Sequence, residues 1–579
     1  MRCVPGFLIA AIMWGQPAFQ NLAPNGDGSA VYFSSSLRMK GTDQYPSQPK
    51  VFVWDANTGV RLYEQAPPTI VPGPPPTWRS DTAYNRIAPS ISSDGRTVAI
   101  TGMTDCNVGT PCGFTVERYE AEIRVNGGDP MVRKGQPSVS PNGRFVALGS
   151  SVLQTLPPQV LSLLDLSTGQ TQNFMNLIGF PRRHGVADDG TVIIDGQSNL
   201  FVQLRQWSGT IVPLNVLFTS APQINAFGTR VFYQIDLDSS IPTLTPRVRL
   251  MTLHVITGEA LELTTVGAAS GFPMPFGISD DGSLAAFIQS GQAWNVRGDG
   301  TGLMQVTHVP DTIVEIALSG SGSHLFAITG NSRMLRVDLR TMAVEEIIPA
   351  TPIAAGLTGR PFVVSPGALF QVITATPPIP EIQSFSLFGR DLPILSASTS
   401  AIELQIPFDM PEGIGWPDAV LKQQSNGPFE SAMLWSGPAT VFSFAPQWYF
   451  VDGHVAALHQ DFSGPITIQS PAHQGEIVHA FGSGFGPVAP QPALGQPASA
   501  NPLSQVTVPF MCGLQGNDPK VIPADLLFGG LAPGWIGLYQ FDIRLPARPA
   551  GADTYLLCGK AANFTFPNIA SGLLPMASN

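Results

Sequence analysis

A short motif that recurs seven times between residues 25 and 328 constrains the fold more than any other feature of the chain. Each copy is a turn ending in glycine, followed at once by an apolar, alternating run typical of a β-strand. Glycine adopts positive φ freely, and aspartate and asparagine tolerate it, so this pairing is typical of tight turns between strands. The turn residues assigned to the motif are Asp27, Gly28, Asp94, Gly95, Asn142, Gly143, Asp189, Gly190, Gly228, Asp281, Gly282 and Gly322.

Each copy continues with further short strands and without a helical stretch of useful length. Residues 51–55 and 163–165 are strand-like runs that end in Asp-x-x-Thr-Gly turns, and a last short strand follows, as at 260–264. The turn glycines recur at intervals that scatter around 40–50 residues, roughly the length of a four-stranded propeller blade. We therefore predict an all-β chain with a seven-bladed β-propeller over residues 19–350. Two stacked sandwiches are the structural alternative.

The order of elements within a copy is also informative. A strand, a Ser-Pro-Asp-Gly-like turn, a second strand and then an Asp-x-x-Thr-Gly turn follow one another, with the turns at 92–95, 140–143 and 165–169 as examples. This order resembles the TolB-like, WD40-like propeller repeats of bacterial envelope proteins. The resemblance implies the same propeller fold for the repeat region.

The charge balance excludes one broad class of partner. The chain has 579 residues, with 30 Lys and Arg against 41 Asp and Glu and a formal net charge of −11. Such a chain has no general attraction to nucleic acid or to anionic lipid, so we expect neither as a partner. Because 43% of the residues are hydrophobic and only 12% are charged, a large folded core is expected rather than disorder.

The first residues have the pattern of a secretory signal peptide. Arg2 precedes a short apolar run at 6–14, and the run ends in Gly-Gln-Pro-Ala at 15–18. We predict a signal peptide over residues 1–18, with Ala18 as the last residue removed; a buried first strand is the alternative. No later run of about 18 apolar residues occurs, so we expect no transmembrane segment in the mature chain. The expected location is the periplasm, the cell surface or the outside of the cell.

Four cysteines follow Cys3 in the sequence. Cys106 and Cys112 flank a turn-rich loop, whereas Cys512 and Cys558 each lie near the end of a strand-like run. An even number of cysteines suits an oxidising compartment, so we expect two disulfides, with four free buried thiols as the alternative. The sequence has no Cys-x-x-Cys spacing and no histidine near either pair, which disfavours a zinc site.

The composition of the sequence changes near residue 350. Prolines punctuate residues 351–377, which we interpret as a linker or as entry strands. Beyond this stretch, short strand-like runs alternate with Gly and Pro turns, as at 401–408, 476–482 and 505–510. This rhythm predicts one or more Ig-like β-sandwich modules over residues 378–579.

The last module carries a longer motif. Its residues are Gly530, Leu531, Ala532, Pro533, Gly534, Gly537, Leu538, Tyr539 and Gln540. Together with the runs 402–407 and 474–487, the motif resembles the C-terminal domain of the Solibacter paralogous family of soil Acidobacteria. The resemblance covers about residues 361–579, although the opening strand at 370–376 departs from the family pattern.

The resemblance implies a secreted or surface protein and no assigned activity. The residues themselves suggest a structural role for the motif. Its glycines can supply turn angles, while Leu531, Trp535, Ile536, Leu538, Tyr539 and Phe541 would anchor the turn in a core. We prefer this interpretation to a ligand site; Tyr539 would become a recognition point only if it were exposed.

Motifs of common enzyme classes do not occur in the sequence. It has no Gly-x-Ser-x-Gly elbow, no His-Glu-x-x-His, no P-loop and no dinucleotide-binding glycine pattern. His454 and His459 share a segment with Asp452 and Asp461; a metal or acid–base role is one interpretation, and we favour a solvated loop. The paired acids at 188–189 and 280–281 are expected to bond local backbone amides. We therefore predict no catalytic residue, no metal site and no cofactor.

These observations favour an exported, non-enzymatic binding or scaffold protein. Its propeller would present loops and a channel mouth to a protein or glycan partner. One alternative is an exported enzyme acting on polysaccharide, with acidic residues at the propeller channel. Two carboxylates about 5–10 Å apart in a funnel would indicate such an enzyme. Another alternative is a structural surface or adhesion protein.

Overall fold

The computed structural model divides the chain into two compact units. The first unit comprises residues 1–353 and 423–434, and the second comprises 354–422 and 435–579. The structure describes residues 18–577 except for 36, 42–49, 65–84, 105–117, 150–160, 175–183, 195–201, 206–210, 215–221, 238–246, 268–273, 352, 359–362, 375–380, 388–389, 399–400, 416, 423–424, 436–438, 519, 548–552 and 562–568. The described residues form strands and turns without a helix, so the predicted all-β class is confirmed for them.

Across the same described residues, no helix is long and apolar enough to cross a membrane.

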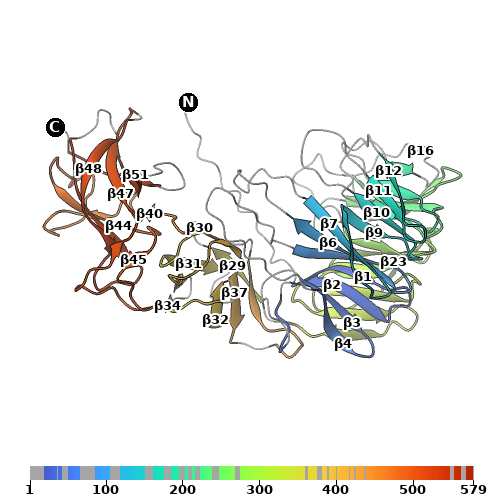
Figure 1. Cartoon of the computed structure of the whole chain (residues 1–579). Helices are drawn as coiled ribbons and strands as arrows, with labels where there is room; N and C mark the ends of the chain where they lie inside the picture. The colour runs from blue at the N-terminus through green and yellow to red at the C-terminus, as the bar shows by residue number, and fades with distance from the viewer. Residues whose placement is uncertain are drawn as a thin grey trace. The chain divides into compact units, whose positions relative to one another are not determined.

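The described part of the first unit contains seven four-stranded antiparallel sheets (Figure 1). Each sheet uses four consecutive strands, and strands that neighbour in sequence also neighbour in space. The first three sheets contain β1 (Phe19–Pro24), β2 (Ala30–Ser35), β3 (Lys50–Asp55), β4 (Gly59–Glu64); β5 (Asn85–Ile91), β6 (Thr97–Thr104), β7 (Arg118–Val125), β8 (Met131–Lys134); and β9 (Gln136–Val139), β10 (Phe145–Gly149), β11 (Leu161–Asp165), β12 (Gln170–Phe174).

The other four sheets have the same order. The fourth and fifth contain β13 (His184–Val186), β14 (Val192–Ile194), β15 (Val202–Arg205), β16 (Ile211–Leu214); and β17 (Gln223–Ile224), β18 (Arg230–Asp236), β19 (Arg247–His254), β20 (Ala260–Gly267). The sixth and seventh contain β21 (Phe276–Ile278), β22 (Leu284–Gln289), β23 (Gln292–Arg297), β24 (Met304–Gln305); and β25 (Ile313–Leu318), β26 (His324–Thr329), β27 (Met334–Asp338), β28 (Val344–Ile348).

The turn after the first strand of each sheet has a shared geometry. All seven turn glycines have positive φ, between 69° and 81°. In the second sheet, Gly95 N–H donates to Ser92 O at 2.9 Å, which closes the turn. Asp94 does not adopt positive φ; its Oδ1 instead accepts the N–H of Arg96 at 3.0 Å. The acidic residue is therefore favoured for its side-chain hydrogen bond, and glycine alone meets the requirement for positive φ.

An apolar cluster lies between each sheet and the next, and the second strand of a sheet contributes to two clusters. On β26, Leu325 and Ala327 pack with the sixth sheet, whereas Phe326 and Ile328 pack with the first. Successive side chains of a strand point to opposite faces. Because both faces are covered, the strand is apolar throughout, which explains the continuous apolar run after each turn.

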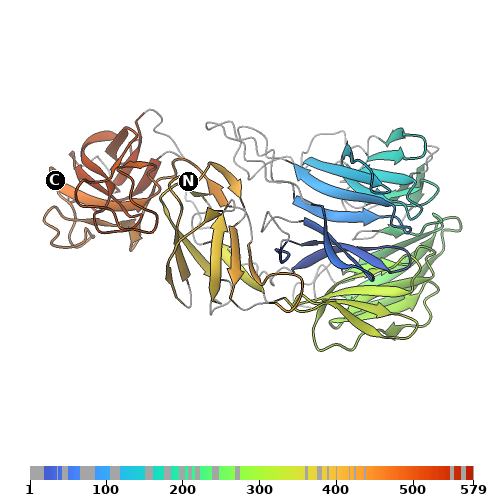
Figure 2. The same ribbon diagram turned by 60° about the horizontal axis from the view of Figure 1, so that its bottom comes forward.

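The seventh of these clusters joins the last sheet to the first and closes the ring, so the first unit is a β-propeller. We call it the seam cluster; its buried members are Ala18, Phe19, Val31, Phe33, Leu37, Phe52, Trp54, Phe326, Ile328, Met334, Ile348, Phe429 and Ala432. The first sheet (blue) and the last sheet (yellow-green) lie side by side in both views (Figures 1 and 2).

The described strands of the two end sheets do not cross the seam. The strands β1 to β4 and β25 to β28 are each consecutive in sequence, so neither sheet borrows a described strand from the other end of the ring. Packing in the seam cluster and a few hydrogen bonds join the two sheets. Ser321 N–H donates to Gly26 O at 2.7 Å, and Arg336 Nε donates to Gly28 O at 3.0 Å.

Phe429 adds a ring from a distant part of the sequence to the seam cluster. The side chain is fully buried, and its ring centroid lies 5.2 Å from that of Phe19 and 5.0 Å from that of Phe52. Backbone hydrogen bonds hold the residues on either side. Lys40 N–H donates to Pro428 O at 2.9 Å, and Glu430 N–H donates to Arg38 O at 2.8 Å. Residues 423–434 are therefore a structural part of the propeller.

Among the described residues, the strands after β28 form two larger sheets and two smaller ones. The order in the eight-stranded sheet is β33-β32-β37-β38-β29-β31-β35-β34, and β30-β39-β36 form a three-stranded sheet. These strands are β29 (Ile353–Thr358), β30 (Val363–Val364), β31 (Leu369–Thr374), β32 (Ile382–Leu387), β33 (Arg390–Asp391), β34 (Ile394–Ala397), β35 (Ala401–Gln405), β36 (Gly413–Gly415), β37 (Pro417–Leu421), β38 (Ala432–Trp435) and β39 (Ala439–Val441).

The ten-stranded sheet has the path β40-β44-β49-β48-β47-β50-β51, with β43, β45 and β46 attached beside it, and β41 pairs with β42. The strands are β40 (Gln447–Trp448), β41 (Phe450–Val451), β42 (His454–Val455), β43 (Ala457–Leu458), β44 (Ile477–Ser483), β45 (Val488–Ala489), β46 (Gln505–Val506), β47 (Phe510–Gln515), β48 (Ile522–Leu531), β49 (Tyr539–Arg544), β50 (Tyr555–Lys560) and β51 (Ile569–Leu573).

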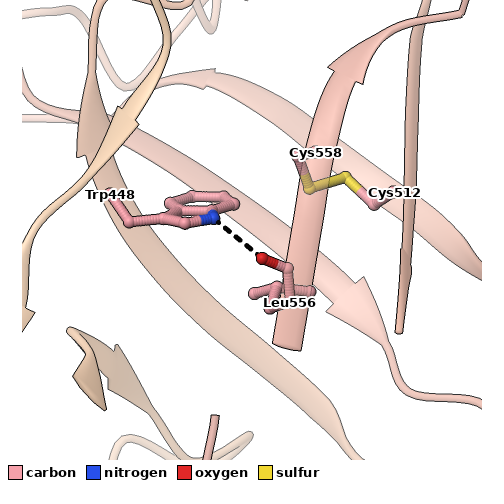
Figure 3. The surroundings of a disulfide bond; sticks show 4 residues. All are labelled: Trp448, Cys512, Leu556 and Cys558. Atoms are coloured by element: carbon pink, nitrogen blue, oxygen red, sulfur yellow. Dashed lines mark hydrogen bonds between the residues drawn. A yellow bond between two sulfur atoms is a disulfide. The ribbon is translucent and has the colours of Figure 1, made fainter. Parts of the chain in front are cut away.

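A disulfide and a buried tryptophan mark the core of this sheet (Figure 3). Cys512 on β47 and Cys558 on β50 are directly opposite one another and are joined, with their Cα atoms 4.2 Å apart. Trp448 packs nearby in the same core, and its Nε1–H donates to Leu556 O at 3.3 Å. The bond links neighbouring strands of one sheet, whereas the disulfide of immunoglobulin domains joins two sheets.

The path of the chain between the units differs from a simple linker. The first unit passes into the second after Ile353, and residues 351–377 contain β29, β30 and β31. Residues 423–434 then return to the first unit. This return was not foreseen, because a single buried aromatic residue in a short segment has no periodic pattern.

Replacing the buried ring tests the seam. We expect Phe429→Ala to destabilise the first unit by about 3–5 kcal/mol, because it opens a void in a buried aromatic cluster. Denaturant-dependent hydrogen exchange of peptides from β1 and β26 measures this. Phe227→Ala is the matched control, since that ring is 65% exposed and should change the free energy of unfolding by less than about 0.5 kcal/mol. Equal exchange in the two variants would contradict the proposed role of Phe429.

Candidate functional site

The second residues of the glycine turns meet at one end of the propeller. First strands of neighbouring sheets contact one another at most junctions of the ring, as β1 does with β5 and β25, so they are the innermost strands. Their turns meet at one end through residues that we call the axial ring: Gly26, Ser93, Pro141, Asp188, Ala226, Asp280 and Gly320.

Backbone hydrogen bonds run from turn to turn around the axial ring. Gly26 N–H donates to Ser93 O at 2.7 Å, and the series continues in the same direction to Gly320. Pro141 has no N–H, and the missing link is replaced by Asn142 N–H, which donates to Asp188 Oδ1 at 2.8 Å. Ser321 N–H completes the circle by donating to Gly26 O.

Close approach explains why small residues are frequent in the axial ring. A Cβ atom on Gly26 would lie 2.8 Å from Ser93 O, which is too near for a side chain. Ser93 Oγ also donates to Asp280 Oδ2, which joins the second sheet to the sixth across the ring. Side chains from opposite sides of the propeller therefore meet at this end, and the turns themselves close it.

Two aspartates sit in this closed end. Burial raises the pKa of Asp280 above its ordinary value, while the hydrogen bond from Ser93 acts against that rise. Burial likewise raises the pKa of Asp188, and the bond from Asn142 opposes it. The four acids at 188–189 and 280–281 were expected to bond local backbone amides, and two of them do so. Asp189 and Asp281 accept local N–H groups at Thr191 and Ser283, whereas Asp188 and Asp280 bond other turns.

Glu315 is a half-buried acid at the seam that the sequence did not single out. It lies on β25, next to a register shift between Ile313 and Glu315, and its Oε1 accepts Leu22 N–H at 2.8 Å. The bond joins the innermost strands of the last and first sheets. Burial raises the pKa of Glu315 to about 7, although hydrogen bonds from the backbone of Leu22 and Asn21 act in the opposite direction.

Phe227 is exposed at a turn position that is polar in the other six sheets. Asp27, Asp94, Asn142, Asp189, Asp281 and Ser321 occupy the equivalent positions. Phe227 is 65% exposed, and Ile256, in the other short turn at the same end of the sheet, is 81% exposed. Val255 N–H donates to Thr229 O at 2.8 Å, which ties the two turns together. Neither side chain contributes to a core, so we call Phe227 and Ile256 the apolar turn pair. The sequence signal for this pair was that Phe227 stands at a turn position where most copies of the motif have Asp or Asn.

The C-terminal motif has a structural role around Tyr539. Leu531, Ala532 and Tyr539 are buried, and Tyr539 Oη donates to Gly486 O. Burial raises the pKa of Tyr539, and a fully buried ring is no surface recognition point. Trp535 was expected in the core, but it is 63% exposed because it lies in the turn between β48 and β49.

The remaining residues of the motif shape that turn. Gly534 and Gly537 have φ of 82° and 61°, and a Cβ on Gly530 would meet Ser504 O. Pro533 forms a bridge with Ala498, and Leu538 O accepts the N–H of Ala532 at 2.9 Å. Gln540 Nε2 donates to Asp542 Oδ1 at 2.8 Å.

The other candidate residues do not converge on a metal site. Cys106 and Cys112 lie outside the described residues. His459 bonds Glu476, and His479 bonds Asp542, so these two histidines pair with separate acids. Within the described part of the chain, no group of three or more His, Cys, Asp or Glu side chains could hold a metal ion.

Comparisons with known proteins give similarity to propellers only at the level of the fold. No protein-family model matches the chain, and no curated protein matches it. The β-propeller domain of the Trilobed protease from Pyrococcus furiosus aligns with a TM-score of 0.36 and 10% identity, over 58% of this chain and 98% of that one.

Two further solved structures align comparably. The β-propeller domain of Cps50 (Swd1) from Myceliophteria thermophila has a TM-score of 0.34 and 10% identity, over 57% of this chain and 96% of that one. Oligogalacturonate lyase from Vibrio parahaemolyticus has a TM-score of 0.31 and 14% identity, over 49% and 76%.

Glu315 should make the stability of the propeller depend on pH. The pKa of this carboxyl is about 7 in the folded chain and about 4.5 in the unfolded chain, so the unfolded state loses the proton first as pH rises. Folding stability therefore decreases from about pH 4.5 to pH 7, by at most about 3 kcal/mol. Denaturant titrations between pH 4.5 and 7.5 should show a smaller decrease in Glu315→Gln. The prediction is wrong if both proteins follow the same curve.

Proposed function

We propose that the chain is an exported binding or scaffold protein whose propeller has seven blades and acts by contacting a protein or glycan. The apolar turn pair carries this proposal. Phe227 and Ile256 expose large apolar surface at one end of the fifth sheet, where the equivalent turn residues are polar. Exposed aromatic and aliphatic side chains without a core role are typical of recognition surfaces.

The closed axial ring limits where a partner can bind on the propeller. A partner cannot use the ring end of the channel where turns meet, so we place recognition on the outer surface of that end. Asp188 and Asp280 are the acids of the axial ring, and both accept hydrogen bonds from other turns. Acids that hold turns together are poorly suited to paired acid–base catalysis, which favours binding over the polysaccharide-acting enzyme.

The same proposal includes export and membership of the Solibacter paralogous family. The disulfide between Cys512 and Cys558 supports an oxidising compartment. The apolar run at 6–14 supports export, and the motif around Tyr539 supports membership of the family. We further propose an Ig-like sandwich for the C-terminal module, supported by its antiparallel sheet and by Trp448 in its core.

Substituting the apolar turn pair tests the binding function. We expect the purified chain to bind a subset of a glycan array, and Phe227→Asp with Ile256→Asp to weaken that binding about tenfold or more, because charge replaces apolar contact area. Leu527→Asp is the control, since Leu527 is 50% exposed on β48 of the second unit and does not belong to the propeller.

The other outcomes separate the alternatives. Glycan binding that survives the double substitution would overturn the assigned surface. An array without signal, combined with concentration-dependent self-association in light scattering, would favour a structural surface protein. Hydrolysis of a bound polysaccharide would favour the enzyme.

Signal cleavage should occur before Ala18 rather than after it. Ala18 is 3% exposed, its N–H donates to Ser332 Oγ at 3.3 Å, and its carbonyl accepts from Ser35 Oγ at 2.7 Å. Cleavage after Ala18 would remove these contacts from the seam cluster. Amino-terminal sequencing of the exported protein should therefore find Ala18 retained; a mature chain that begins at Phe19 would contradict this.

A further inference from the structure

Three side chains of the second unit form a linked series that neither the binding function nor the family motif uses. His459 Nδ1 lies 2.6 Å from Glu476 Oε1, and His459 Nε2 lies 3.0 Å from Ser470 Oγ. Nε2 also lies 3.2 Å from the carbonyl oxygen of Ser470. A hydroxyl, an imidazole and a carboxylate thus follow one another at hydrogen-bond distances.

The segment between β43 and β44, residues 459–476, brings the three residues together, and we call it the excursion. His459 directly follows β43, and Glu476 directly precedes β44; these two strands pair antiparallel, so the ends of the excursion are adjacent. Ser470 lies in the turn between them. Thr467 N–H donates to Ser470 O at 3.0 Å, and Ser470 N–H donates to Thr467 Oγ1 at 3.0 Å, which fixes the turn.

Glu476 is held in place by the backbone. Its Oε2 accepts His473 N–H at 2.8 Å, and its Oε1 accepts Gln460 N–H at 3.4 Å. Burial acts to raise the pKa of Glu476, but the hydrogen bonds from His473 and His459 outweigh it and keep the pKa below the ordinary value. The ionised carboxylate therefore assigns the proton of neutral His459 to Nδ1. Nε2 then lies in position to accept the hydroxyl proton of Ser470, and once protonated it can donate to the carbonyl oxygen of Ser470.

The exposure of the three groups follows the order that acyl transfer requires. Glu476 and His459 have side chains only 13% and 14% exposed, whereas Ser470 is exposed. Two apolar side chains of the same excursion, Phe462 and Ile468, are 58% and 68% exposed. Phe462 stacks on His479 of β44 with ring centroids 4.0 Å apart, and this contact fixes the position of the Phe462 ring. Both side chains therefore expose apolar area on the segment that carries Ser470.

A clasp that merely holds the excursion closed is the competing explanation. A hydrogen bond from an exposed serine hydroxyl contributes little to stability, about 1 kcal/mol or less. A clasp of this kind requires neither a buried, backbone-oriented carboxylate nor an accessible hydroxyl. A nucleophile, a base and a group that orients the base require both.

We propose that Ser470, His459 and Glu476 form a Ser-His-Glu site that hydrolyses carboxylic esters with short apolar acyl groups. His459 Nε2 takes the proton of Ser470 as Oγ bonds to the ester carbonyl carbon. The protonated His459 then gives this proton to the leaving alcohol as the ester C–O bond breaks, and an acyl-serine remains. Water, deprotonated by His459, attacks the acyl-serine; the acid departs and the proton returns to Oγ. Glu476 is a positioning residue that stabilises the transient imidazolium.

The full-length protein with p-nitrophenyl acetate and butyrate tests the site. We expect Ser470→Ala and His459→Gln each to lower kcat/KM by about 10²-fold or more, because each removes the nucleophile or its base. A fluorophosphonate probe should modify wild type on the peptide that contains Ser470 and leave Ser470→Ala unmodified. Ser463→Ala is the matched control, since Ser463 is an exposed serine of the same excursion. Equal hydrolysis by wild type and Ser470→Ala, or no modification of Ser470, would overturn the proposal.

Glu476 needs a readout that distinguishes positioning from folding. We expect Glu476→Gln to lower kcat more than it raises KM and to change the pH profile of kcat, with partial recovery in Glu476→Asp. Thermal unfolding of each variant is measured beside the kinetics. Loss of activity that only parallels loss of folded protein, without a changed pH profile, would make Glu476 a structural residue and contradict its assigned role.

Discussion

Packing between the first and the last sheet is the interaction on which the propeller depends. Neither of these sheets includes a described strand from the other end of the ring, so backbone pairing within a sheet does not lock the two ends together. The seam cluster takes over that task through buried aromatic side chains, among which Trp54 and Phe326 have ring centroids 6.1 Å apart. Phe429 enters this cluster from a segment that the chain reaches only after several strands of the second unit. A contact so distant in sequence is slow to form, because the loop must close before the contact stabilises anything.

The axial ring shows how one local rule has a global effect. Each turn needs a glycine at its fourth position for positive φ, and each turn then offers its second residue to the next turn. Where the two backbones approach most closely, as at Gly26, only a hydrogen atom fits. The turns consequently close their end of the channel, and the acids there become structural. The apolar turn pair lies outside this contact network, which is why we assign recognition to it.

In the second unit, the structural motif and the residues of the proposed hydrolytic site lie in different segments of the chain. The residues around Tyr539 bury a ring, shape a turn and bond Gly486, and these contacts account for most of the motif. Ser470, His459 and Glu476 belong to a different excursion and carry no recognisable sequence pattern. The spacing of eleven positions between His459 and Ser470 has meaning only once the excursion folds back on itself.

The sequence by itself determined the local structure. Period-two patterning and glycine turns specify short strands and their connections, because these depend on residues a few positions apart. The apolar runs, such as Leu325 to Ile328, indicated strands, whereas the packing of both their faces was decided by the tertiary structure. The tertiary partner of a side chain, in contrast, was decided only by the tertiary structure. Phe429 in the seam cluster, Glu315 against β1, Asp280 against Ser93 and His459 against Ser470 all depend on which distant backbone lies within a few ångströms. That choice follows from ring closure and packing, for which a single sequence has no local signal.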